Sequence, residues 1–330
     1  MNMRNNNFKC GLFAILLLLC AACSSEGLSK TSSAEKQTTA DEKTETIETG
    51  TRTVTYLDKE YILPADAKRI VIAGSMEAME DALVLNVKPI GASTVAGSFP
   101  DRFEKITAET DPIGEKIEPN LETILKLKPD VILGSTKFPD EKMMELEKIA
   151  PTIRISHLSS DWEANLTFMG ELTGKKQLAE KEIKKYSQQL EATKKKFDGT
   201  SLAEKNVLAV RLRSGKLFIY PENVYVNSVL YEDLGLPVPA ELKDVKAQQQ
   251  ISIEGLAEMD PDYLFVQFSA DENGKTDQAL EELKANPVIN NIKAIKENHV
   301  FVNVIDPLAE GGPAWSRIKF LDKALSSLTE

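Results

Sequence analysis

Two arginines placed two residues apart are well suited to binding an anion. Arg211 and Arg213 lie at the end of the apolar run 207–213. On a β-strand this spacing puts both side chains on the same face. Two cations on one face repel each other unless they share an anion. The Ser-Gly pair that follows predicts a turn into a hairpin strand.

Three lysines stand at positions that favour the same chemistry. Lys137 directly follows a predicted strand, and the carboxyl end of a strand is where α/β sheets bind ligands. Lys116 lies six residues before Glu122, and Lys246 lies eight residues before Glu254, so each lysine precedes a matching predicted helix. Together with the two arginines, these cations predict a cleft for a polyanion. The alternative is that they are ordinary surface residues.

Glu122 and Glu254 each fall in the first turn of a short predicted helix. The helix dipole favours carboxylates there, which is a sufficient structural explanation. The alternative is an exposed pair of carboxylates, one in each half of the chain, that docks onto a two-fold symmetric partner.

Signatures of enzymes are scarce. The sequence contains no GxSxG nucleophile elbow, no P-loop and no HExxH motif. His157 follows a predicted strand and His299 precedes one, so we expect loop or capping residues rather than catalytic bases. Two histidines cannot build a His-rich metal site. The net charge of −11 argues against general binding to nucleic acid or to anionic membrane surfaces.

The elements that position these residues alternate between strand and helix. With 330 residues and 42% hydrophobic residues, the chain can form one large or two medium domains. The alternation predicts an α/β fold with mainly parallel sheets. The predicted segments are Arg69–Ala73, Met76–Leu85, Val131–Gly134, Asp140–Ile149, Thr152–Ser156, Val207–Leu212, Asn227–Leu236, Tyr263–Phe268, Asp277–Leu283, Val300–Val304 and Trp315–Leu328.

An internal repeat divides the folded part in two. Residues 121–133 and 253–265 share a Glu, a Pro-Asp pair and a following apolar run at a constant offset of 132 residues. Each copy predicts a short helix, a turn and a buried strand. We interpret the repeat as two related lobes; the alternative is chance similarity of a common connection.

A long amphipathic helix is predicted between the halves, over Lys175–Phe197. Its apolar residues recur at helical spacing, and its opposite face is mostly Lys, Glu and Gln, which we interpret as a solvated face. At 1.5 Å per residue it would be about 35 Å long, enough to join two lobes rigidly.

The N-terminal residues predict export. Residues 1–22 have the basic start and short apolar core of a signal peptide, too short to span a bilayer. Two alanines precede Cys23, which we expect to be lipidated; the alternative is ordinary cleavage after Ala22. No cysteine follows Cys23. Residues 23–51 then predict a lipidated cysteine and a flexible tether, because almost no large apolar residue is present.

The sequence resembles the class III substrate-binding lipoproteins of iron-siderophore ABC importers, in particular the subfamily that binds ferric bacillibactin and enterobactin. The resemblance covers nearly all of Tyr56–Thr329. It is carried by the segments 74–81 (GSMEAMED), 114–120 (GEKIEPN), 135–139 (STKFP), 211–213 (RLR), 218–221 (FIYP), 246–248 (KAQ), 265–269 (FVQFS) and 306–309 (DPLA).

The resemblance implies two α/β lobes joined by one long rigid helix, and it implies a basic patch between the lobes that holds the siderophore. The expected domains are an N-terminal lobe at 52–160, a helical connection at 161–198 and a C-terminal lobe at 199–330. The expected permease-docking residues are Glu122 and Glu254. The expected ligand-binding residues are Lys116, Lys137, Arg211, Arg213, Lys246 and Gln248.

The resemblance also implies a binding protein rather than an enzyme. Its expected partners are a ferric siderophore, an ABC permease with its ATPase, and the membrane through the lipid anchor. We expect a monomer on the outer face of the cytoplasmic membrane, with no cofactor and with iron bound only as ferric siderophore.

Three alternatives remain open. The first is a receptor for a carboxylate or mixed siderophore of the petrobactin type, since Ser98 and Ser214 replace a lysine and a glutamine of the subfamily pattern. The second is a siderophore esterase, which would need a Ser-His-acid set. The third is a structural lipoprotein.

Overall fold

The computed structural model describes residues 50–329, apart from the side chains of Ala203, Leu325 and Thr329. The predicted signal peptide, Cys23 and most of the predicted tether lie outside the described residues. The described fold begins with the hairpin β1 (Thr51–Tyr56) and β2 (Lys59–Pro64). Its turn residues Leu57 and Asp58 both have positive φ, which matches the right-handed twist of paired strands.

The first large sheet is mainly parallel, as predicted. Four of its five pairings are parallel, and the edge pair β5–β6 is antiparallel. All four residues of the central β3 are buried, as expected of a strand covered on both faces. The order is β6-β5-β4-β3-β7-β8, with β3 Ile70–Ala73, β4 Gly91–Thr94, β5 Asp111–Glu115, β6 Glu118–Pro119, β7 Val131–Ser135 and β8 Thr152–Ile155.

The helices of this lobe follow the strands in the predicted alternation. The first one begins at the predicted residue because Ser75 caps it, accepting a hydrogen bond from the Ala78 N–H. The helices are α1 Met76–Leu85, α2 Glu104–Thr107, α3 Leu121–Leu127, α4 Asp140–Glu147 and α5 Trp162–Leu172.

The second sheet differs from the prediction of a mainly parallel sheet. Two of its pairings are parallel and two are antiparallel. The reason is the turn after β9, where Ser214 and Gly215 both have positive φ and reverse the chain into β10. The order is β11-β10-β9-β12-β13, with β9 Val207–Arg213, β10 Lys216–Ile219, β11 Gln249–Ile251, β12 Tyr263–Phe268 and β13 Val300–Val302.

The helices of this lobe also follow the predicted pattern, with one change of type. The predicted helical segment 227–236 contains a π-helix at Ser228–Asp233. The other helices are α7 Ile253–Met259, α8 Gln278–Ala285 and α9 Lys293–Lys296.

The structure confirms that the internal repeat forms equivalent elements. Helices α3 and α7 each follow an antiparallel edge strand and are capped by the side chains of Asn120 and Ser252. Asp130 accepts a hydrogen bond from the Arg69 N–H just before β3. Asp262, at the equivalent position, accepts one from the Asn206 N–H just before β9. The two lobes therefore share this arrangement of an edge strand, a capped helix and a hydrogen-bonded aspartate.

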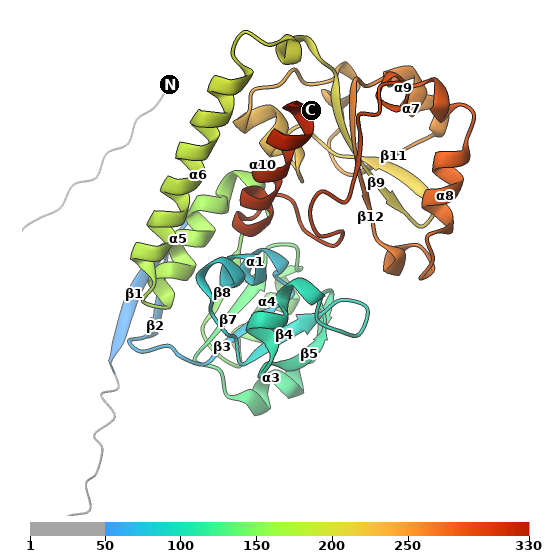
Figure 1. Cartoon of the computed structure of the whole chain (residues 1–330). Helices are drawn as coiled ribbons and strands as arrows, with labels where there is room; N and C mark the ends of the chain where they lie inside the picture. The colour runs from blue at the N-terminus through green and yellow to red at the C-terminus, as the bar shows by residue number, and fades with distance from the viewer. Residues whose placement is uncertain (1–49, 330) are drawn as a thin grey trace, which may run out of the picture. The chain divides into compact units, whose positions relative to one another are not determined.

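The predicted long helix is present as α6 (Lys176–Phe197), about 33 Å long. Figure 1 shows it as a single unbroken helix. Its buried Tyr186 meets the edge of Trp162, with 5.1 Å between the ring centroids. Helix α6 is therefore held near its middle by aromatic packing, which suits a rigid connection between the two lobes.

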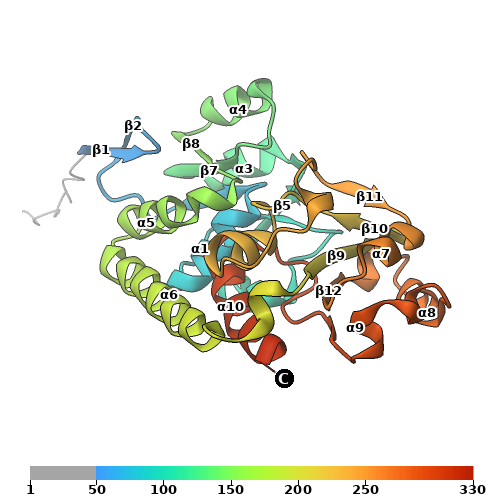
Figure 2. The same cartoon turned by 90° about the horizontal axis from the view of Figure 1, so that it is seen from above.

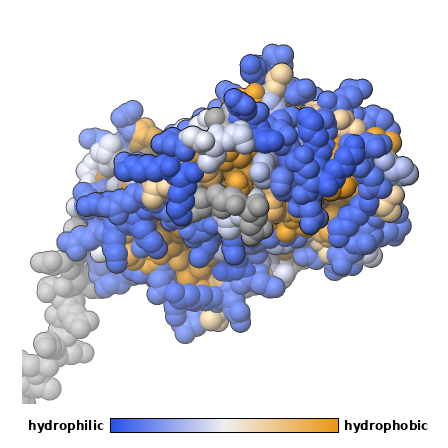
Figure 3. Space-filling view, turned by 45° about the horizontal axis from the view of Figure 1, so that its top comes forward, coloured by the Kyte–Doolittle hydropathy of each residue, from blue (hydrophilic) through white to orange (hydrophobic). Residues whose placement is uncertain are grey.

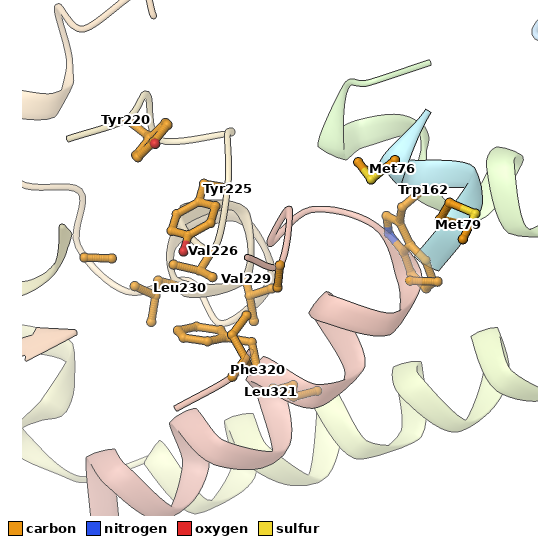
Figure 4. Packing of buried hydrophobic residues seen from close by; sticks show 14 of the residues in the cluster. Met76, Met79, Trp162, Tyr220, Tyr225, Val226, Val229, Leu230, Phe320 and Leu321 are labelled. Atoms are coloured by element: carbon orange, nitrogen blue, oxygen red, sulfur yellow. The ribbon is translucent and has the colours of Figure 1, made fainter. Parts of the chain in front are cut away.

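The last helix, α10 (Ala314–Thr329), crosses back to the first lobe and packs against α1, α5 and α6. Figures 1 and 2 show α10 near α1 and α6. Its Phe320 and Leu321 lie close to Val229 and Leu230 of the π-helix in Figure 4. The division of the chain at residues 161 and 199 stays a prediction, and this helix shows that the C-terminal segment also contacts the first lobe.

A buried arginine joins α10 to its surroundings. Arg317 donates to the Ser159 carbonyl and to the Ser228 hydroxyl, both at 3.0 Å, and forms an ion pair with Asp233. Its guanidinium lies 5.3 Å from the Trp162 ring centroid. Because its charge is almost fully enclosed, it depends on these partners.

No helix among residues 50–329 combines the length and the apolar character needed to cross a bilayer. The face drawn in Figure 3 is mostly hydrophilic, with smaller hydrophobic areas between the hydrophilic residues.

Candidate functional site

A cleft of about 530 Å³ is lined by residues from both lobes. All six residues predicted to bind the ligand line it, although they come from four separate segments of the chain. The lining residues are Glu77, Lys116, Lys137, His157, Leu158, Ser159, Ser160, Arg211, Arg213, Tyr220, Asn223, Val224, Tyr225, Lys246, Ala247, Gln248, Glu272, Glu310, Gly312 and Pro313.

The two lysines of the N-terminal lobe share a carboxylate. The Nζ atom of Lys137 lies 2.7 Å from Glu77 Oε1 and 3.4 Å from Glu310 Oε2, and the Nζ atom of Lys116 lies 3.7 Å from Glu310 Oε1. Burial would lower the pKa of Lys137, but Glu310 and Glu77 outweigh it and raise the pKa. Burial likewise opposes the ionised form of Glu310, and the surrounding cations hold its pKa well below the usual value.

The two arginines of the C-terminal lobe also share a carboxylate. Glu272 Oε2 accepts a hydrogen bond from Arg211 Nε at 3.0 Å, and Glu272 Oε1 lies 3.3 Å from Arg213 Nε. The Arg211 guanidinium lies 5.8 Å from the Tyr225 ring centroid, and the Tyr220 and Tyr225 rings lie 5.0 Å apart. Burial raises the pKa of Tyr225 above its usual value. The anion that the two arginines share in this structure is therefore the carboxylate of Glu272.

Strand register explains why these groups meet. Arg211 is the fifth residue of β9 and pairs with Gln267 of the parallel strand β12. The chain leaves β12 at Phe268 and forms a 3₁₀ turn at Ala270–Glu272. Because neighbouring parallel strands end at the same edge of a sheet, this turn brings Glu272 to the two arginines.

Lys246 and Gln248 complete the cleft from the segment before β11. Both are exposed, and within the described residues Lys246 forms no ion pair. Its charge is therefore available to an incoming group.

The floor beneath Glu310 is polar and buried. Glu80 of α1 accepts hydrogen bonds from the N–H groups of Glu310 at 2.9 Å and Ser316 at 3.1 Å, and Arg102 lies 3.7 Å away. Burial raises the pKa of Glu80 to about 7, although Arg102 and these hydrogen bonds act in the opposite direction. Burial raises the pKa of its neighbour Asp81 as well. Glu80 thus anchors the backbone that carries Glu310 into the cleft.

Sequence reasoning missed the carboxylates and the tyrosines of the cleft. A signal exists for Glu272, because it follows the carboxyl end of the predicted strand Tyr263–Phe268. A signal also exists for Glu77, because it lies in the first turn of the helix after the predicted strand Arg69–Ala73. Glu310 lies in a loop with no periodic pattern. No local sequence pattern therefore predicts that Glu310 lines the cleft.

The remaining candidates lie as follows. Glu122 and Glu254 are exposed in the first turns of α3 and α7, as predicted. His157 lies in a loop, its Nδ1 2.7 Å from the Thr136 hydroxyl, and it lines the cleft. The His299 ring stacks on Tyr263 with 4.4 Å between centroids.

The two serines that replace subfamily residues do not line this cleft. Ser98 is exposed beside the bridge to Val95. Ser214 lies in the turn after β9 and lines a neighbouring surface hollow, which shares Glu272 with the cleft. Neither is among the residues that line the cleft.

Two α/β lobes, one long connecting helix and a charged cleft lined from both lobes define a class III substrate-binding protein, so the predicted fold class is confirmed. The sequence matches the periplasmic binding protein family over residues 71–303, and the chain belongs to this family.

Several individual proteins of known sequence or structure are similar to this chain over most of its length. An iron-uptake system-binding protein of Bacillus subtilis (strain 168) is 46% identical over 319 residues, which are 97% of each protein. The crystal structure of the B. subtilis triscatecholate siderophore-binding protein FeuA, complexed with ferri-bacillibactin, matches with a TM-score of 0.79 and 48% identity, over 84% of this chain and 98% of that one. Staphylococcus aureus SirA, complexed with staphyloferrin B, matches with a TM-score of 0.70 and 26% identity, over 84% and 98%.

Proposed function

We propose that this protein is an extracytoplasmic receptor that binds a ferric triscatecholate siderophore in the cleft and delivers it to an ABC permease for iron uptake. The observation that carries the proposal is the meeting of Lys116, Lys137, Arg211, Arg213 and Lys246 in one cleft. The likeness to FeuA, which was crystallised with ferri-bacillibactin, supports the ligand class.

The chemistry of the ligand fits such a cleft. Three doubly charged catecholates around Fe³⁺ leave a trianion, and arginine and lysine can donate charge-assisted hydrogen bonds to its oxygens. Cations that lie over catechol rings add about 0.5–2 kcal/mol each. Since the siderophore fills the coordination shell of the iron, the protein needs no metal ligand of its own. A neutral ferric hydroxamate would gain much less from the same cations.

A second candidate is a receptor for a carboxylate or mixed siderophore. It is favoured by the likeness to SirA, which was crystallised with staphyloferrin B. Carboxylate oxygens also accept hydrogen bonds from lysine and arginine. Affinities for ferric catecholate, carboxylate and mixed complexes, measured side by side, distinguish the two candidates.

Binding, rather than hydrolysis, is the activity we propose. An esterase would need a serine activated by a histidine and an acid. His157 bonds to Thr136, and His299 stacks on Tyr263, which does not supply that arrangement. Incubation of a trilactone siderophore with the protein should leave the ester bonds intact.

For delivery, we propose that Glu122 and Glu254 dock the two lobes onto the permease. Both are exposed, and both occupy the same position of an equivalent helix. We also propose that Cys23 carries the lipid that holds the receptor at the outer face of the cytoplasmic membrane. A Cys23→Ala variant should be lost from the membrane fraction.

The experiment that tests the proposed ligand is a titration of tryptophan fluorescence in the folded domain. Saturable quenching is expected with ferric enterobactin or ferric bacillibactin, and none with a ferric hydroxamate of similar absorbance. Quenching by the hydroxamate alone would overturn the assignment of the ligand class.

A further inference from the structure

The cations of the cleft are largely neutralised by acids of the protein itself. Five basic side chains and three carboxylates line the cleft, so its formal charge is +2 rather than +5. Two of these carboxylates, Glu272 and Glu310, each contact a pair of cations. A trianionic ligand must therefore compete with groups already present.

Glu272 is held in place by both arginines and by its own turn. The Nη2 atom of Arg211 lies 2.9 Å from Glu272 Oε2, and Arg213 reaches the other carboxylate oxygen. The Glu272 carbonyl also accepts a hydrogen bond from the Ser214 N–H at 3.0 Å, which ties the turn to the end of β9. The carboxylate thus occupies donors that would otherwise face a ligand.

Glu310 occupies the lysines in a comparable way, from the opposite lobe. Its segment follows β13 of the second sheet, whereas Lys116 and Lys137 lie in the turns after β5 and β7 of the first sheet. The hydrogen bond from its backbone to the buried Glu80 fixes the segment. Its carboxylate therefore stays near both lysines.

We infer that Glu272 and Glu310 are resident counter-anions, one for each basic pair, that lower the affinity of the cleft for a multiply charged anion. The inference rests on the proposed function for the identity of that anion. Like charges repel in proportion to the product of their charges. Each carboxylate therefore opposes a trianion more strongly than a dianion of the same shape. A lower affinity also favours release of the ligand to a transporter.

The test compares one siderophore loaded with two metals. A triscatecholate complex of Fe³⁺ is a trianion, and the complex of Ti⁴⁺ with the same ligand is a dianion. Affinities of both complexes are measured by tryptophan quenching for the wild type, Glu272→Gln and Glu310→Gln. Glu281→Gln is the matched control, since it also loses a carboxylate paired with a lysine, 3.1 Å from Lys284, but lies outside the cleft.

Each cleft variant should bind the ferric complex about tenfold more tightly than the wild type, with a slower dissociation rate. The logarithm of the gain should be about two-thirds as large for the Ti⁴⁺ complex, while Glu281→Gln should change neither affinity. The two acids lie on different elements, so either variant alone suffices should the other fail to fold.

Unchanged or weakened binding in a folded variant would overturn the inference, and so would equal gains for the two complexes. If the wild type binds neither complex, the proposed function itself fails, and this inference fails with it. If the wild type binds both and the variants do not bind more tightly, only the inference fails.

Discussion

At the scale of single residues, the two arginines differ in how firmly the protein holds them. The side chain of Arg211 is 13% exposed, and that of Arg213 is 42% exposed. Hydrogen bonds to charged groups contribute about 1.5–3 kcal/mol, and more when an enclosed partner is left unpaired. We therefore expect Arg211→Ala to weaken binding of a ferric triscatecholate about 100-fold and Arg213→Ala about tenfold. Fluorescence titration measures both.

The control for this prediction is Lys284→Ala, which removes an ion-paired cation outside the cleft. It should bind like the wild type. Wild-type affinity in both arginine variants would contradict the assignment of these residues to the ligand.

A second prediction at this scale concerns Glu80. Its pKa is about 7 in the folded protein against 4.5 for the free side chain. Between these values the folded state holds a proton that the unfolded state has released, so the free energy of unfolding falls as pH rises from about 4.5 to about 7. The loss amounts to roughly 3 kcal/mol. Asp81, whose pKa burial also raises, acts in the same direction.

Glu80→Gln should remove the contribution of Glu80 to this slope, because the amide does not titrate, while the contribution of Asp81 should remain. Urea denaturation at several pH values measures the slope for both proteins. Glu281→Gln, on the exposed face of α8, should keep the wild-type slope. Identical slopes for wild type and Glu80→Gln would show that this carboxyl is ionised throughout the range.

At the scale of elements, Arg317 holds α10, the π-helix and the start of α5 together. Arg317→Met approximately keeps the volume, but it removes the cation paired with Asp233 and the donor to the Ser159 carbonyl. Breaking such a buried ion pair costs about 3–5 kcal/mol, and we expect a loss of that size in the free energy of unfolding. Chemical denaturation measures it. A loss below about 1 kcal/mol would mean that Tyr186, which donates to Asp233 at 2.5 Å, suffices to hold this junction.

At the scale of the whole molecule, binding and delivery use different surfaces. Glu122 and Glu254 do not line the cleft. The double variant Glu122→Ala and Glu254→Ala should bind ferric siderophore with wild-type affinity but should lose most iron uptake in cells. Radiolabelled iron accumulation measures uptake.

The matched control is Glu118→Ala with Glu258→Ala, which removes two exposed acids near the same helices. It should support normal uptake. Normal uptake by the first double variant would remove the docking assignment.

Much of this protein could be predicted from its sequence, because the signals are local. Helix α1 and strand β12 have their predicted bounds, set by a capping serine and by a buried β-rich run. The repeat at 132 residues identifies two equivalent lobes before any contact between them is known. Spacing and position likewise predict the five cations, since the carboxyl ends of strands face one edge of a sheet. Gln248 is identified by family resemblance alone.

Only the tertiary structure decided how those charges are balanced. Glu272 reaches Arg211 across 61 residues, Glu310 reaches Lys137 across 173, and the Glu310 backbone reaches Glu80 across 230. Such contacts depend on strand order and on the return of the C-terminal segment to α1, neither of which has a local pattern. Sequence spacing predicts which side of an element a side chain occupies, whereas the electrostatic state of the cleft depends on which elements the fold brings together.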